Sequence, residues 1–167
     1  MLPSKRRTAT EAEAAALASG IRLRIIRLTF SEALTNKELA ERLGRDPATT
    51  LHHVRKLVEH GFLTAQPPRR GTRGAREIPY LSTGLSWTLD SHGDRGVEEA
   101  MLEAYLAEIA DTGFEGVHQT RLVVQLAAEE REELRTRLNQ LLEEFRERPV
   151  RPGGERTAIY LATYPSS

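Results

Sequence analysis

The 167-residue chain contains no cysteine and carries 24 Lys and Arg against 24 Asp and Glu, so its net charge is zero. The absence of cysteine excludes a disulfide framework and a metal site built from thiolates. No apolar run approaches the roughly 18 residues that a membrane-spanning helix needs, so we expect a cytoplasmic protein without a membrane partner.

The neutral total hides two oppositely charged halves. Residues 1–90 carry 15 Lys and Arg against 9 Asp and Glu, a net charge of +6, and residues 91–167 carry 9 against 15, a net charge of −6. A basic half suits an anionic partner such as nucleic acid, whereas an acidic half repels one. We therefore expect two domains, residues 1–90 and residues 91–167, with different roles.

The first predicted helix begins after Thr10, which forms a capping box with Glu13. The following residues are strong helix formers, and the apolar pattern predicts that the helix continues through Leu28. Arginines on its outer face either meet phosphates or form a plain charged surface; these are Arg22, Arg24 and Arg27.

Two shorter helices are predicted next. Thr35 and Glu38 form a second capping box, and Gly44 ends the helix that they begin. Asp46 caps the next helix, which extends to His60 and has Pro47 in its first turn. Because the turn between the two helices is only a few residues long, they must pack at a steep angle.

The second of these helices separates apolar from polar residues. At about 100° per residue, one side is expected to be buried and to hold Leu51, Val54, Leu57 and Val58. The opposite side holds Thr49, His52, His53 and Lys56, with Arg55 at its flank. A polar, cationic outer face is how a helix-turn-helix enters the DNA major groove. The alternative is an ordinary solvated helix face.

A wing is predicted after this helix. Residues 62–65 and 78–81 have the composition of two paired strands. The loop between them contains four arginines and no acidic residue from 69 to 76; the arginines are Arg69, Arg70, Arg73 and Arg76. A cationic hairpin tip can contact the DNA backbone or the minor groove. The alternative is a solubilising loop.

These motifs resemble the winged helix-turn-helix of the ArsR family of bacterial transcriptional regulators. The similarity runs through Ala16–Ile25, Leu34–Gly44 and Asp46–Leu63, within residues 14–82. It implies a homodimer that binds an inverted-repeat operator, usually as a repressor that a signal releases. Well-known members sense metals through cysteines in the helix where this chain has Leu39-Ala40-Glu41, so we expect neither a metal nor a cofactor.

The acidic half is predicted to begin with a connection, residues 82–96, that includes a strand-like segment at 85–89. A helix follows at 97–110, and its apolar residues spread around most of its circumference. Such a helix must be covered on most sides, so we expect it to form the main dimer contact. The expected contact residues are Met101, Leu102, Tyr105, Leu106 and Ile109. The alternative is a core helix within one chain.

The last segment alternates between two kinds of pattern. Residues 118–126 and 156–164 alternate as strands do, and residues 129–148 carry a single apolar stripe typical of a helix. One such unit is too small to be stable alone, so it should pack on the preceding helix or pair across a dimer. A small-molecule effector could bind at this junction.

The predicted fold is mainly α with small β: a winged helix-turn-helix domain, a helical dimerisation segment and a small strand-helix-strand appendage. The chain has no glycine-rich phosphate loop, nucleophile elbow or HExxH motif, so we do not expect an enzyme. We predict a sequence-specific regulator that binds double-stranded DNA as a homodimer, with repression as the expected outcome. The alternative is a winged-helix module that binds proteins and not specific DNA.

Overall fold

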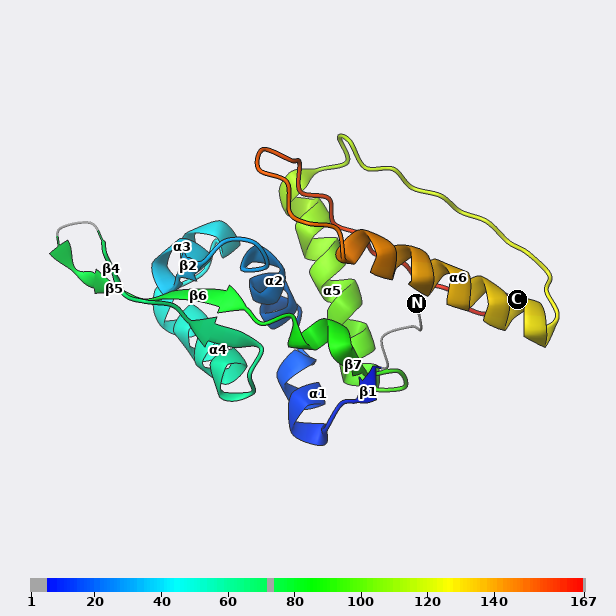
Figure 1. Ribbon diagram of the computed structural model, residues 1–167, viewed down its shortest axis with the longest axis horizontal. Helices are drawn as coiled ribbons and strands as arrows, with labels where there is room; N and C mark the ends of the chain where they lie inside the picture. Colours follow the sequence, from blue (N-terminus) through cyan, green and yellow to red (C-terminus); the bar gives the residue numbers. More distant parts are fainter. Residues whose placement is uncertain (1–5, 72–73, 167) are drawn as a thin grey trace. The chain divides into compact units, whose positions relative to one another are not determined.

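The computed structural model describes residues 6–71 and 74–166 (Figure 1). The described residues form two compact units, one that extends to Gly113 and one that begins at Phe114. Helices account for most of the regular structure and the strands are short, which confirms the predicted fold class.

The first unit contains helices around a small central sheet. Its helices are α1 (Glu11–Leu17), α2 (Gly20–Leu28), α3 (Asn36–Leu43), α4 (Pro47–Glu59) and α5 (Arg95–Thr112). In the central sheet, β6 (Pro79–Ser82) pairs antiparallel with both β2 (Leu34–Thr35) and β3 (Leu63–Ala65). The predicted wing strands are thus confirmed as β3 and β6.

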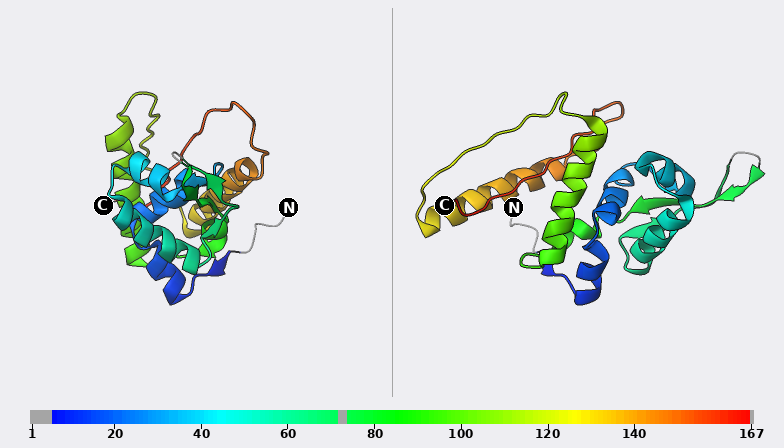
Figure 2. Two further views of the ribbon diagram at one scale, coloured as in Figure 1. Left: turned by 90° about the vertical axis from the view of Figure 1, so that its left-hand side faces the viewer. Right: turned by 180° about the vertical axis from the view of Figure 1, so that it is seen from behind.

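Two smaller strand pairs complete this unit. Between β3 and β6, β4 (Arg69–Arg70) and β5 (Arg76–Glu77) form an antiparallel hairpin. Figures 1 and 2 show this hairpin projecting beyond α3 and α4. Near the N-terminus, β1 (Arg7–Thr8) pairs in parallel with β7 (Leu89–Asp90).

The start of α1 follows the prediction. Thr10 caps the helix and forms a capping box with Glu13. The Glu13 carboxylate also accepts from Arg7, with a shortest N···O distance of 2.5 Å. The hydrogen bonds from Arg7 and Thr10 lower the pKa of Glu13 to about 2. This carboxylate therefore joins the first helix to β1.

The predicted continuous helix to Leu28 is wrong, because the chain breaks at Ala18 and Ser19 before α2 begins. The Arg22 side chain occupies this break. Its guanidinium donates hydrogen bonds to the carbonyl oxygens of Ala16 and Ala15, the latter at 2.9 Å. Arg22 is only 9% exposed. It therefore satisfies carbonyl groups that the end of α1 would otherwise leave unpaired.

The other two arginines of α2 bind to α5. Arg24 pairs with Asp111, and Arg27 Nη1 lies 2.5 Å from Glu108 Oε2. Nearer to the start of α5, Glu103 Oε2 accepts from the Gly20 backbone N–H at 3.2 Å. Arg22, Arg24 and Arg27, for which phosphate binding and a plain charged surface were both open, are therefore engaged by groups of their own unit.

Caps define the turn between α3 and α4, as predicted. Thr35 and Glu38 form the capping box of α3, and Gly44 ends that helix with φ of 59°. Asp46 accepts from the Thr49 N–H at 2.9 Å to cap α4, and Pro47 occupies its first turn. Positive φ is costly for residues with a Cβ atom, so the glycine permits this short connection.

The predicted strand-like segment at 85–89 is wrong over most of its length. Residues Leu85–Thr88 form a 3-10 turn, η2, and only Leu89 enters a strand, β7. Local hydrogen bonds explain the difference: Thr88 Oγ1 donates to the Leu85 carbonyl at 2.8 Å, and the Trp87 N–H to the Gly84 carbonyl at 3.1 Å.

Helix α5 packs within the first unit. It contacts α1 and α2, and its buried residues are Val97, Ala100 and Ala104. The compact unit consequently extends to Gly113. The division of roles between residues 1–90 and 91–167 stays a prediction.

The second unit contains one of the three predicted elements. Helix α6 (Ala128–Arg146) corresponds to the predicted helix at 129–148. The strands predicted at 118–126 and 156–164 do not form in these described segments, which have no ladder partner. An alternating pattern makes a strand only when another strand accepts its backbone hydrogen bonds. Throughout the described residues, no helix combines the length and apolar character needed to cross a membrane.

Arg22→Met should destabilise the first unit by about 1–3 kcal/mol, because the buried Ala16 carbonyl at the end of α1 loses its donor. Urea denaturation followed by circular dichroism measures this loss. Arg45→Met is the matched control, since Arg45 is exposed. Equal stability of the two variants would contradict the capping role of Arg22.

Candidate nucleic-acid interface

The rotational setting of α4 differs from the predicted one. The buried side holds Thr50, Val54 and Leu57, whereas Leu51 is half-buried and Val58 is exposed. Thr50 can be buried because its hydroxyl donates to the Asp46 carbonyl at 2.9 Å, which leaves no unpaired donor. The predicted full burial of Leu51 and Val58 is therefore wrong. Because the buried side is centred on other residues, the outward face also consists of a different set of residues.

The outward face of α4 is centred on His52 and Arg55. At about 100° per residue these two lie opposite the buried side, together with Ala48 and Glu59. All four are exposed. Two other predicted residues lie along one edge of this face, where Thr49 is exposed and Lys56 is half-buried.

His53 lies nearer to the interior than the prediction placed it. It is half-buried, and its Nδ1 atom is buried without a hydrogen-bond partner among the described residues. Burial lowers the pKa of His53, and the positive charges of Arg22, His52, Arg45 and Lys56 lower it further. The ring is therefore favoured in its neutral form at the margin between α4 and the core.

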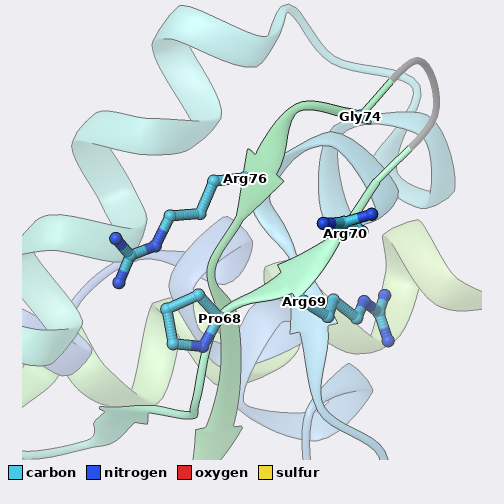
Figure 3. Close-up of a pocket in the computed structure, with 5 residues that line it drawn as sticks. All are labelled: Pro68, Arg69, Arg70, Gly74 and Arg76. Atoms are coloured by element: carbon cyan, nitrogen blue, oxygen red, sulfur yellow. The ribbon is translucent and has the colours of Figure 1, made fainter.

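The wing arginines extend to different sides of the hairpin. Figure 3 shows Arg69 and Arg76 on opposite sides, with Arg70 beside Arg69. A hollow of about 360 Å³ is lined by Pro68, Arg69, Arg70, Gly74 and Arg76. Arg69 Nη2 lies 2.5 Å from Glu38 Oε1. The fourth predicted wing arginine, Arg73, lies outside the described residues.

The cations of the first unit fall into two groups. Those at the α1, α2 and α5 side are engaged, as shown by the bonds of Arg7, Arg22, Arg24 and Arg27. Within residues 6–71 and 74–113, the cations with no ion pair, side-chain hydrogen bond or ring contact belong to α3, α4, their turn and the hairpin. They are Lys37, Arg45, Arg55, Lys56, Arg70 and Arg76.

The residues predicted to form a dimer contact lie on an apolar side of α5 that this unit leaves uncovered. Met101, Leu102 and Leu106 are 41%, 46% and 57% exposed, and Tyr105 and Ile109 are half-buried. Leu102, Tyr105, Leu106 and Ile109 follow i, i+3, i+4, i+7 spacing, which places them in one stripe. This stripe faces away from the buried residues Val97, Ala100 and Ala104.

Sequence reasoning missed several residues of this surface. Ala48 was not identified because the predicted setting of α4 was rotated, and a small apolar side chain there suits a thymine methyl group. Lys37 lies in the first turn of α3 and Arg45 in the turn before α4, where a search for cations over the whole helix-turn-helix would have found them. The described residues contain no group of three or more His, Asp or Glu side chains that could hold a metal ion.

Residues 17–66 match the family model described as "Helix-turn-helix domain". This match lies inside residues 14–82, whose motifs resemble the ArsR winged helix-turn-helix. No curated protein matches the sequence.

Several solved structures are similar to this chain. Reduced HlyU from Vibrio cholerae is 20% identical, with 57% of this chain and 84% of that chain covered and a TM-score of 0.36. The homodimeric winged helix-turn-helix domain of Mb0332 from Mycobacterium bovis, described as a possible ArsR-family transcriptional regulator, is 25% identical. The match covers 64% of this chain and 82% of that chain, with a TM-score of 0.36. Lactococcus lactis ZitR in complex with DNA is 22% identical. The match covers 75% of this chain and 74% of that chain, with a TM-score of 0.34.

The match to the family model and the arrangement of the elements agree. Helices α3 and α4 with their short turn fall inside the matched residues, and β3 and β6 follow α4 as the strands of a wing. The chain therefore contains a helix-turn-helix domain of the winged form, the fold with which many transcriptional regulators bind DNA.

Proposed function

We propose that this protein is an ArsR-like, sequence-specific regulator of transcription that binds an inverted-repeat operator as a homodimer in the cytoplasm. Repression is the outcome that the family resemblance implies. The observation that carries the proposal is the division of the cations. Arg24 and Arg27 of α2 are paired with α5, whereas the cations without a partner in the described part of the first unit belong to α3, α4, their turn and the wing.

Helix α4 has the properties of a recognition helix. Its outward face presents Ala48, His52 and Arg55, and Thr49 lies at its edge. Arg can bind guanine O6 and N7, and Thr or Ala can contact a thymine methyl group. Glu59 occupies the C-terminal end of this face, so the N-terminal part is the better one to approach bases. The N-terminal residues of recognition helices make base contacts in this way.

Phosphate contacts are assigned to the cations around this face. Lys56 lies at its edge, Arg45 in the turn, and Arg70 and Arg76 on the hairpin. Each cation that neutralises a phosphate releases counterions, so DNA affinity should fall steeply with salt. His53 is a weaker candidate because its Nδ1 atom is buried.

The exposed stripe of α5 supports the homodimer. An apolar helix face gains stability when a second copy covers it, and a two-fold axis makes both copies use the same stripe. Two recognition helices related by that axis read half-sites as an inverted repeat. Binding of a small-molecule effector by the acidic half stays a prediction. A protein-interaction module remains the competing function, because winged helices also bind proteins.

Arg55→Ala should relax the preference at one base position, at a cost of about 1–3 kcal/mol. Lys56→Ala should instead weaken binding to every sequence and lower the salt slope of log K by about one unit, as loss of a phosphate contact does. Fluorescence anisotropy with labelled duplexes at several salt concentrations measures both effects. Arg137→Ala on α6 removes the same charge as a control. If all three variants had the same DNA affinity and the same salt slope, the result would favour the protein-interaction module.

Leu106→Glu should convert the dimer to a monomer, because it places two charged groups at the symmetric apolar contact. The dimer dissociation constant should rise at least about a hundredfold. Sedimentation velocity measures the state, and folding should persist because Leu106 is 57% exposed. Phe30→Glu, at an equally exposed position, is the control. A variant that remains dimeric would show that α5 does not form the interface.

A further inference from the structure

The backbone ladder of the wing is interrupted between its two parts. Ala65 pairs with Tyr80, and the next paired residues are Arg69 and Glu77. Three residues therefore separate the pairs on one strand and two on the other, which is the arrangement of a β-bulge. The Gln66 N–H still donates to the Pro79 carbonyl at 2.8 Å. Pro67 and Pro68 have no N–H to donate, so they add no backbone hydrogen bond between the distal hairpin and the central sheet.

The distal hairpin is weakly stabilised by itself. Its strands are two residues each, and a short two-stranded hairpin is marginal in water. Arg70 lies directly opposite Arg76, where like charges are unfavourable. A contact from outside the hairpin is therefore needed to fix its direction.

Glu38 supplies that contact from α3. Its Oε1 and Oε2 atoms lie 2.5 and 2.6 Å from Arg69 Nη2, across a separation of 31 residues. Its Oε2 atom also accepts from the Thr35 N–H at 2.7 Å within the capping box. One carboxylate thus joins the start of the helix-turn-helix to the base of the distal hairpin.

This carboxylate is held in its charged form. Desolvation opposes ionisation, but the hydrogen bonds from Thr35 and the charges of Arg69 and Arg42 outweigh it. The pKa of Glu38 is consequently below its ordinary value. At neutral pH Glu38 therefore carries the negative charge that an ion pair with Arg69 requires.

We propose that Glu38 and Arg69 set the direction of the wing, so that Arg69 is a positioning residue and Arg70 and Arg76 are the wing cations that meet DNA. This inference rests on the proposed DNA-binding function. It has an unusual consequence, because removal of an acidic charge near DNA ordinarily strengthens binding. Here the loss of Glu38 weakens binding, since the wing loses its anchor.

Glu38→Gln is the informative variant. Glutamine can replace glutamate in a capping box, so α3 keeps its cap while the charge that holds Arg69 is lost. Glu41→Gln is the matched control, since Glu41 is an exposed acid on the same helix without an ion pair among the described residues. Thermal unfolding of both variants confirms that they fold.

The first measurement uses the free protein. The chain has no cysteine, so Ala75→Cys gives one labelling position on the exposed part of the hairpin. In time-resolved anisotropy of the attached dye, Glu38→Gln should increase the amplitude of the fast motion and Glu41→Gln should not. Equal amplitudes in the two variants would overturn the proposal. This result does not depend on whether the protein binds DNA.

The second measurement uses duplex DNA. Glu38→Gln should weaken binding about two- to fivefold, the range expected for an exposed ion pair, whereas Glu41→Gln should leave it equal or tighter. Adding Arg69→Ala to Glu38→Gln should cause no further loss. A further loss with a lower salt slope would show that Arg69 binds phosphate directly and would overturn its positioning role. If the unsubstituted protein binds no DNA, the proposed function fails and the anisotropy still decides whether Glu38 anchors the wing.

Discussion

The rotational setting of α4 is the constraint on which the proposed DNA-binding surface depends. Thr50, Val54 and Leu57 are buried, and a helix that buries these three must turn His52 and Arg55 outward. Asp46 makes this setting possible at the start of the helix. Its carboxylate caps the Thr49 N–H, and its carbonyl accepts the Thr50 hydroxyl. A local cap and a buried polar side chain thus determine which residues α4 turns outward, toward the proposed major-groove contact.

The acidic residues determine which cations are available to DNA. Glu108 and Asp111 of α5 engage Arg27 and Arg24, and Glu38 engages Arg69. The cations left without such a partner in the described first unit lie around the helix-turn-helix and the hairpin tip. Net charge by itself does not reveal this division, because a basic residue that already has a carboxylate partner gains less from a phosphate. The distribution of ion pairs therefore points to the proposed DNA-binding side more sharply than the +6 charge of residues 1–90 does.

The features that the sequence predicted correctly are mostly local. Both capping boxes, the Asp46 cap and the Gly44 turn each involve residues within a few positions of one another, so their chemistry is visible in the sequence. The break before α2 depends on where the Arg22 side chain reaches, and the Glu38–Arg69 pair spans 31 residues. Periodicity alone could not show that Thr50 is buried in place of Leu51. The alternating segments at 118–126 and 156–164 have strand patterns, but a pattern does not provide a pairing partner.

Selection of DNA from a random pool by the purified full chain, at near-physiological salt, tests the central claim most directly. The account predicts enrichment of an inverted repeat whose half-sites lie about one helical turn, or a multiple of it, apart. That result would require both a sequence-reading α4 and a two-fold dimer. Salt-sensitive retention without an enriched sequence would contradict base recognition by the outward face of α4. Failure to retain any DNA would contradict the DNA-binding function itself.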